Sequence, residues 1–204
     1  MIVAVINYGV GNISSVQKAF QDLGAQVVFC TPSDLHRADK IVLPGVGSFA
    51  EAMPRVRVGG WISALEDAVY VSEKPVLGIC LGMQMLGTQS SEGGSSEVLN
   101  FIPGTVEKLD IFGCQLRIPH VGWNEVEMKI DAKLFEGIPD KSDFYFVHSY
   151  AFRPRNTNNL LATTSYGVDV AAVINKNNVY GCQFHPEKSS KAGRQLLNNF
   201  LRYT

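Results

Sequence analysis

Gly78-Ile79-Cys80-Leu81-Gly82 is the stretch of sequence that decides the fold. The apolar run Pro75–Ile79 predicts a buried strand, and Leu81–Thr88 predicts a helix that leaves this strand directly. A strand that turns sharply into a helix, with glycine two residues before and after a central cysteine, is the pattern of a nucleophile elbow. Glycine is needed at both positions because a side chain there would collide with the neighbouring backbone. The stretch therefore predicts an α/β domain with the Cys80 sulfur at the carboxyl end of a strand.

The sequence before the elbow alternates short apolar strands with helical patterns. The expected strands are Ile2–Ile6, Gln26–Cys30 and Lys40–Leu43, and the expected helices are Ser14–Leu23 and Trp61–Val71. Strands that alternate with helices pair in parallel and are covered by helices on both faces. We therefore expect a layered α/β/α domain with a mostly parallel, mixed central sheet.

The sequence after the elbow changes to shorter strand-like runs with turn signals. Strands are expected over Thr105–Leu109, Phe144–Tyr150, Leu160–Ser165, Val168–Ile174 and Val179–Phe184, with hairpin turns at Tyr166-Gly167 and Asn175–Asn178. The Ser- and Gly-rich patch Ser90–Ser96 is expected to be a surface loop, and a final amphipathic helix is expected from about Ser189. The chain has no internal repeat, and we expect residues 1–204 to form one domain.

The composition excludes several classes of protein. Hydrophobic residues make up 46% of the chain, which is enough for a core and excludes disorder as the main state. The net charge is −1, so the basic excess of a nucleic-acid binder is missing. No apolar run reaches the roughly 18 residues of a membrane span, and no basic segment precedes the first strand as in a signal peptide. We therefore expect a soluble, cytoplasmic protein without nucleic-acid or membrane partners.

The four cysteines, at positions 30, 80, 114 and 182, show no Cys-x-x-Cys spacing. Neither a metal site nor a disulfide framework is expected from this pattern, and we expect no cofactor. A free cysteine is ordinarily a small buried hydrophobe, which suits Cys30 and Cys182. Cys80 is the candidate nucleophile, and the alternative is a structural cysteine between two packing glycines.

His185-Pro186-Glu187 supplies the partners that a nucleophilic cysteine needs. His185 ends an expected strand, where it can take a proton from the cysteine and later return one. Residues two apart on an extended chain point to the same side, so Glu187 can reach the other ring nitrogen and fix the tautomer. The alternative is an ordinary strand-to-helix turn.

Pro44-Gly45-Val46-Gly47-Ser48-Phe49 follows a buried strand and admits three interpretations. The first interpretation is a degenerate dinucleotide-binding fingerprint, although the third glycine is missing. The second is a simple turn. The third is a loop that donates backbone N–H groups to an oxyanion beside the elbow, a role that requires close backbone approach. We favour the oxyanion loop because it belongs with Cys80 and His185.

Together these motifs resemble the class I (triad) glutamine amidotransferases. The matching stretches are Pro44–Gly47, Gly78–Gln84 and Phe184–Ser189, which follow the order of the family and span most of the chain. Within the family, the chain is most similar to the glutaminase subunits of imidazole glycerol phosphate synthase, through Asn7–Asn12, Pro119–Asn124 and Val147–Tyr150. The resemblance implies a flavodoxin-like fold and hydrolysis of glutamine to glutamate and ammonia.

The resemblance also implies a role for each matching residue. Cys80 would attack the glutamine amide, His185 would act as base and then acid, and Glu187 would orient His185. The other implied contacts fall into two groups: the backbone N–H groups of Leu81, Gly45 and Val46 for the oxyanion, and Gln84 with the Ser149–Tyr150 backbone for the substrate. The alternatives are a polar first-turn residue for Gln84 and a strand end for Ser149.

Finally, the resemblance implies a partner. In the enzymes resembled, the glutaminase forms a heterodimer with a (β/α)8-barrel cyclase subunit, which uses the ammonia to convert PRFAR to imidazole glycerol phosphate and AICAR in histidine biosynthesis. The candidates for the partner-facing surface are Asn12, Trp123, Tyr145 and Lys188. An exposed Trp suits an interface anchor, while a core Trp remains the alternative. Three rival interpretations are a stand-alone cysteine hydrolase, a nucleotide-binding module and a glutaminase that serves another synthase.

Overall fold

A nine-stranded mixed sheet runs through the centre of the computed structural model, which describes residues 1–9, 13–93 and 96–204. Its strand order is β2 (Gln26–Val28), β1 (Ile2–Val5), β3 (Lys40–Gly45), β4 (Val76–Cys80), β13 (Val179–Cys182), β12 (Asp169–Lys176), β11 (Leu160–Ser165), β8 (His120–Met128) and β9 (Ser142–His148). The strands from β2 to β13 pair in parallel, and those from β13 to β9 pair antiparallel. The parallel half has the strand order of the flavodoxin-like fold.

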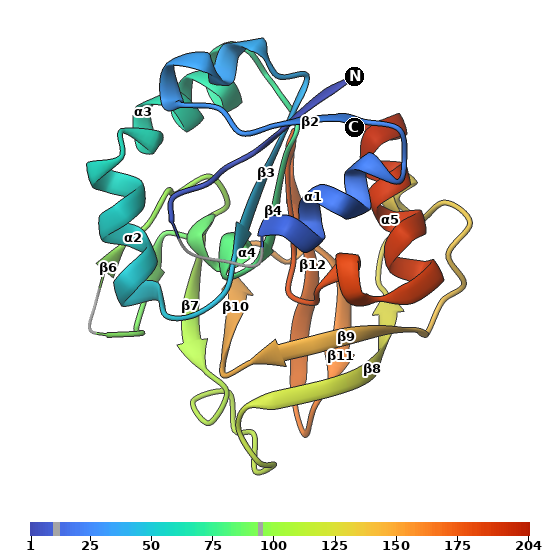
Figure 1. Cartoon of the computed structure of the whole chain (residues 1–204). Coiled ribbons are helices and arrows are strands. Elements are labelled where there is room, and N and C mark those ends of the chain that lie inside the picture. The colour runs from blue at the N-terminus through green and yellow to red at the C-terminus, as the bar shows by residue number, and fades with distance from the viewer. Residues whose placement is uncertain (10–12, 94–95) are drawn as a thin grey trace.

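Helices cover both faces of this sheet (Figure 1). One face carries α1 (Ile13–Gln21) and α5 (Ser190–Tyr203), and the other carries α2 (Phe49–Val58) and α3 (Trp61–Glu66), the latter continued by the π-helical segment Asp67–Val71. Alternate residues of a strand point to opposite faces, so Val3 packs in the α1/α5 core while Ala4 packs in the α2/α3 core. The expected α/β/α arrangement is confirmed.

A second, four-stranded sheet lies beside the first, in the order β10 (Tyr150–Pro154), β7 (Gly104–Lys108), β5 (Gln89–Ser90) and β6 (Ser96–Glu97). Val106 of β7 and Phe152 of β10 are buried in the α2/α3 core. Short 3-10 turns complete the fold at η1 (Pro32–Arg37), η3 (Lys133–Phe135), η4 (Thr157–Asn159) and η5 (Pro186–Lys188).

Three sequence-based expectations need correction. The ends of Ser90–Ser96 belong to strands β5 and β6, so this patch is not simply a loop. The expected strand Phe144–Tyr150 breaks at Ser149, because the chain passes there from β9 in one sheet to β10 in the other. The helix after the elbow, α4 (Leu81–Met85), is shorter than expected, since the chain turns into β5. The motif Pro119–Asn124 lies within β8 from His120 onward.

No helix among residues 1–9, 13–93 and 96–204 is both long enough and apolar enough to span a membrane.

Candidate active site

Cys80 sits on a strained turn between β4 and α4. Its backbone has φ 55° and ψ −110°, a conformation that a residue with a side chain rarely adopts. A Cβ atom on Gly82 would lie 1.7 Å from the Leu43 carbonyl oxygen, and one on Gly78 would lie 2.7 Å from the Gly82 backbone. Both glycines are therefore required for α4 to start this close to β3 and β4, as the elbow pattern predicts.

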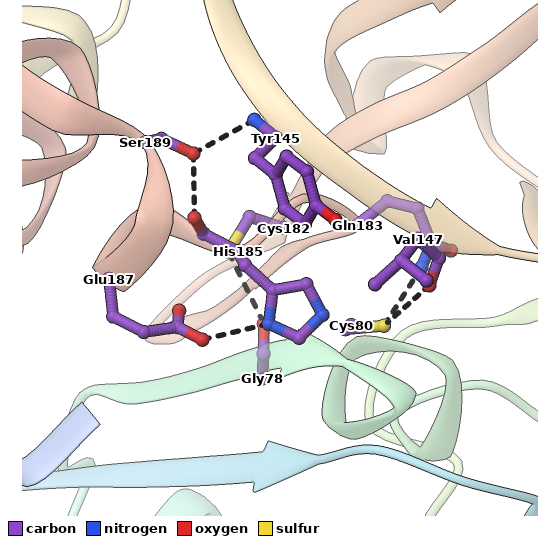
Figure 2. A network of polar contacts seen from close by, with 9 residues as sticks. All are labelled: Gly78, Cys80, Tyr145, Val147, Cys182, Gln183, His185, Glu187 and Ser189. Atoms are coloured by element: carbon purple, nitrogen blue, oxygen red, sulfur yellow. Dashed lines mark hydrogen bonds and ion pairs between the residues drawn. The ribbon is translucent and has the colours of Figure 1, made fainter. Parts of the chain in front are cut away.

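His185 lies between Glu187 and Cys80 in the close-up of Figure 2. Its Nδ1 is 2.8 Å from Glu187 Oε1, and its other ring nitrogen points toward the Cys80 sulfur. The side chains of His185 and Glu187 are only 2% and 1% exposed. Within the described residues, His185 Nε2 and Glu187 Oε2 are buried without a hydrogen-bond partner. The histidine therefore has one nitrogen fixed by a carboxylate and the other directed at the nucleophile.

The charge state of His185 suits an ion pair with a thiolate. Burial lowers the pKa of His185, but interactions with Cys80 and with the Glu187 carboxylate outweigh it and raise the pKa to about 9. At neutral pH the ring is therefore an imidazolium.

The contact between His185 and Glu187 was expected, but the reason given for it was wrong. Glu187 does not lie on an extended chain; it lies in the 3-10 turn η5, which starts at Pro186. Ser189 Oγ donates to the His185 carbonyl at 2.6 Å and accepts from Tyr145 N at 3.0 Å, while His185 N donates to Tyr145 O at 2.9 Å. These bonds, drawn in part in Figure 2, hold the turn against β9.

The Cys80 sulfur is also held by groups that the motifs did not point to. Gln183 Nε2 donates to Cys80 Sγ at 3.7 Å, and the thiol lies 3.7 Å from the Val147 carbonyl oxygen. Gln183 Oε1 in turn accepts from Gln84 Nε2 at 3.0 Å. Gln183 is fully buried, and its only sequence signal is its place two residues before His185. Gln183 therefore fixes the position of the Cys80 sulfur beside the pocket.

The predicted oxyanion loop lies against the start of α4. A Cβ on Gly45 would meet Tyr8 Oη at 2.7 Å and Leu81 Cβ at 2.9 Å, so the two expected sources of N–H donors are adjacent. Tyr8 Oη donates to the Pro44 carbonyl at 2.8 Å. Burial, together with the nearby Cys80 charge, raises the pKa of Tyr8 and keeps its hydroxyl protonated. Tyr8 was not singled out from the sequence, although it lies in the Asn7–Asn12 motif.

A pocket of about 310 Å³ opens beside Cys80. Most of the residues predicted for the site line it: Val46, Cys80, Leu81, Gln84, Ser149, Tyr150 and His185. Gly45 and Glu187 do not line it; Glu187 contacts His185 instead. Gly47 of the predicted oxyanion loop also lines the pocket, as do Pro119, Val147 and His148, which lie in the quoted motifs but had no assigned role. Glu92 is the lining residue that sequence reasoning missed.

Glu92 places an acidic group in this pocket. Burial raises the pKa of its carboxyl group, and a hydrogen bond from the Phe49 backbone opposes that rise. Glu92 belongs to the Ser90–Ser96 patch, for which the sequence predicts only a surface loop. Its sequence signal is that it is the one acidic residue in that patch.

Three of the residues predicted to face a partner form a cluster on the surface. The rings of Trp123 and Tyr145 are 6.0 Å apart, and Lys188 Nζ is 6.0 Å from the centre of the Tyr145 ring. Trp123 is 53% exposed, so it is a surface residue and the alternative of a core Trp is excluded. Asn12, the fourth candidate, lies outside the described residues.

Comparison with known proteins places this geometry in a family. The profile of the family described as "Glutamine amidotransferase class-I" matches residues 4–203. The chain is 46% identical over 202 residues to imidazole glycerol phosphate synthase subunit HisH 1 of Campylobacter jejuni (strain RM1221), covering 98% of this chain and 100% of the relative. It is 44% identical over 201 residues to the HisH subunit of Moorella thermoacetica (strain ATCC 39073 / JCM 9320), covering 97% of this chain and 93% of the relative.

Solved structures agree on the fold. A glutamine amidotransferase from Thermotoga maritima superposes with a TM-score of 0.68 at 20% sequence identity, over 98% of this chain and 96% of that one. At this identity the likeness concerns the fold alone. The elbow and the buried His–Glu pair agree with the sequence matches, which extend over nearly the full length. The chain therefore belongs to the class I glutamine amidotransferases and, within them, to the HisH family of imidazole glycerol phosphate synthase subunits.

Proposed function

We propose that the chain is the glutaminase subunit of imidazole glycerol phosphate synthase and that Cys80, His185 and Glu187 carry out the hydrolysis of L-glutamine. The observation that supports these roles most directly is the position of His185, with one nitrogen on the Glu187 carboxylate and the other directed at the Cys80 sulfur beside the pocket. A nucleophile, a base and a group that orients the base are the three parts that acyl transfer from an amide requires.

The first half of the reaction releases ammonia. The Cys80 thiolate attacks the side-chain carbonyl carbon of glutamine, and the carbonyl electrons move onto the oxygen. Backbone N–H groups of Leu81 and of the Gly45-Val46 segment stabilise this oxyanion. When the intermediate collapses, the C–N bond breaks and the His185 imidazolium gives its proton to the departing nitrogen. The products of this half are ammonia and a glutamyl thioester on Cys80.

The second half regenerates the enzyme. His185, now neutral, takes a proton from a water molecule that attacks the thioester carbon. The C–S bond then breaks, glutamate leaves, and the thiolate–imidazolium pair is restored. Glu187 stabilises the imidazolium each time it forms and keeps the His185 ring in one orientation.

The amino-acid end of glutamine requires its own contacts. Gln84 and the Ser149–Tyr150 backbone line the pocket, and we assign them to this end of the substrate. Glu92 also lines the pocket, and its carboxylate has the charge that the α-ammonium group of glutamine requires. Glu92 thus distinguishes a free amino acid from a simple amide.

Ammonia passes to the cyclase partner, a (β/α)8 barrel in heterodimeric contact with this chain, where PRFAR becomes imidazole glycerol phosphate and AICAR. Trp123, Tyr145 and Lys188 are our candidates for the docking surface, because an exposed aromatic cluster with a cation suits an interface anchor. The cytoplasmic location expected from the sequence remains a prediction.

The test is glutamate release from glutamine by the purified chain, alone and with the cyclase subunit and its ligand. We expect strong stimulation by the loaded partner and loss of the activity in Cys80→Ala. Release that is equally fast without the partner would favour a stand-alone hydrolase. No release under either condition, or release that survives Cys80→Ala, would overturn the proposed roles.

A further inference from the structure

Two buried histidines take no part in the mechanism above: His148 in the wall of the glutamine pocket, and His120 in contact with it. They are 2% and 6% exposed, and His148 lines the pocket. The His120 ring is stacked between two aromatic rings, with centroid distances of 4.8 Å to Phe146 and 4.0 Å to Tyr166. Both histidines lie in motifs quoted above without an assigned role, and the fold brings them into contact: His120 starts β8, and His148 ends the paired strand β9.

The hydrogen bonds of this pair connect four residues in a line. His148 Nδ1 lies 2.8 Å from the Tyr150 carbonyl oxygen, and His148 Nε2 lies 3.0 Å from His120 Nδ1. His120 Nε2 lies 3.3 Å from Asn124 Nδ2. The hydrogen bonds therefore run from Asn124, in the middle of β8, to the Tyr150 peptide at the pocket.

The direction of each bond follows from the two ends of the line. A carbonyl oxygen only accepts, so His148 Nδ1 carries a proton and donates it to Tyr150. Asn124 Nδ2 also donates to the Ser165 carbonyl at 2.9 Å, while Asn124 Oδ1 accepts from Glu125 N, which fixes the orientation of the amide. Asn124 Nδ2 is therefore the donor to His120 Nε2. If both rings are neutral, His120 Nδ1 donates to His148 Nε2 and every donor meets an acceptor.

Burial keeps both rings neutral. It lowers the pKa of His120 to about 4. It lowers the pKa of His148 to about 3, with the nearby His120 and His185 adding to the effect and the bond to Tyr150 opposing it. Neutral His120 and His148 rings are compatible with the His185 imidazolium at the same pocket, whereas the His185 charge would repel a second imidazolium.

The end of the line is the peptide group that shapes the substrate site. Tyr150 is paired with Lys108 of β7, and Leu109 N donates to Ser149 O at 3.0 Å. In this antiparallel register the N–H and C=O of Tyr150 both point away from β7. The Tyr150 carbonyl accepts from His148 Nδ1 and also from Gln84 Nε2, at 2.9 Å. Two side chains therefore fix the orientation of this peptide where the chain passes from one sheet to the other.

We propose that Asn124, His120 and His148 are positioning residues for glutamine: their hydrogen bonds run in one direction and hold the Tyr150 peptide in the orientation that binds the substrate. The inference rests on the proposed function, since it assigns the Ser149–Tyr150 backbone to glutamine. Both nitrogens of His120 are hydrogen-bonded, so their burial is compensated, and an apolar ring at this position would leave His148 Nε2 without its donor.

Two substitutions at one position separate the hydrogen bond from the packing. His120→Phe keeps an aromatic ring between Phe146 and Tyr166 but removes the donor to His148. His120→Asn loses the stacking but places an amide N–H where His120 Nδ1 was. Tyr166→Phe serves as a matched control, since it keeps the stacked ring and removes only the hydroxyl, which donates to Arg117 O.

In the complex with the cyclase and its ligand, we expect His120→Phe to raise the KM for glutamine about tenfold, equivalent to 1.4 kcal/mol, with kcat within about twofold of wild type. The effect falls on KM because the Tyr150 peptide lies at the amino-acid end, away from the reacting amide. His120→Asn is expected to stay within about threefold of the wild-type KM despite a lower Tm, and Tyr166→Phe to match wild type. The opposite result, a wild-type KM in His120→Phe and a raised KM in His120→Asn, would overturn the proposal.

A second measurement does not depend on activity. In the 15N NMR spectrum of the labelled wild-type chain at neutral pH, both His120 and His148 should show a protonated Nδ1 and an unprotonated Nε2, and His120→Phe should change the His148 signals. A protonated Nε2 on His148 would contradict the direction of the line. Because this readout needs no substrate, it also separates a failure of this inference from a failure of the glutaminase assignment.

Discussion

Replacing Glu187 with Gln isolates the charge of the buried carboxylate from its shape. A Gln side chain still offers an oxygen to His185 Nδ1, at the position where Glu187 Oε1 now accepts at 2.8 Å. The charge, however, is lost in a site where the Glu187 side chain is only 1% exposed. Hydrogen bonds to charged groups contribute about 1.5–3 kcal/mol, against about 1 kcal/mol for neutral ones. We therefore expect the imidazolium to lose about 2 kcal/mol, which corresponds to about a thirtyfold fall in kcat.

The same substitution should change the pH profile in a defined direction. The His185 imidazolium is present below its pKa of about 9 and is lost as the pH rises through that value. Without the Glu187 charge, the pKa of His185 falls toward its ordinary value, so the imidazolium is lost at lower pH. The basic limb of kcat/KM should therefore move to lower pH by about one to two pH units, the equivalent of about 2 kcal/mol.

The assay is glutamate release by the complex, measured between about pH 6 and about pH 10, the range in which the imidazolium titrates. Glu136→Gln is the matched control, since it removes a carboxylate that is 51% exposed and pairs with Lys133 on the surface. That control should leave both the rate and the profile unchanged. If Glu187→Gln keeps its basic limb near pH 9 and loses less than about threefold in kcat, the electrostatic role assigned to Glu187 is wrong.

Two further predictions concern the substrate pocket and the elbow. Glu92→Gln should raise the KM for glutamine at least about tenfold with little change in kcat, because a charge-assisted bond to the α-ammonium group is lost. Steady-state kinetics of the complex test this prediction. An unchanged KM would show that Glu92 does not bind the substrate. Gly82→Ala should lower the Tm by about 10 °C, because the new Cβ lies 1.7 Å from the Leu43 carbonyl oxygen and overpacking of this kind costs about 3 kcal/mol. Gly24→Ala, whose Cβ meets no atom within 4 Å, should lower the Tm by less in the same calorimetric scan.

The sequence predicted the parts of the site that depend on local geometry. A strand that turns into a helix at Cys80 requires glycine at 78 and 82, and both positions have no room for a Cβ. His185 and Glu187 are neighbours along the chain, so their contact was predictable even though the 3-10 turn between them was not. The parallel half of the sheet was also predictable, because the alternation of strands and helices is a local pattern in the sequence.

The parts that were missed depend on contacts between distant segments. Tyr8 reaches Pro44, Gln183 reaches Cys80, and His148 reaches His120, and none of these pairs shares a periodic pattern or a local motif. Glu92 was missed for a different reason: a Ser- and Gly-rich composition is typical of a surface loop, and composition does not reveal that a loop folds over a pocket. A polar residue that acts through such a long-range contact is recognised only when the chain is folded.

The η5 turn after His185 also covers an edge of the large sheet. β9 is the last strand of the large sheet, and an edge strand with free N–H and C=O groups is a template for pairing with another chain. Here the outward groups of Tyr145 are bonded to Ser189 and His185, and the Val147 carbonyl faces the Cys80 thiol. The segment that carries the base thus covers the sheet edge. Variants that loosen this turn should therefore aggregate more readily than wild type, in addition to losing activity.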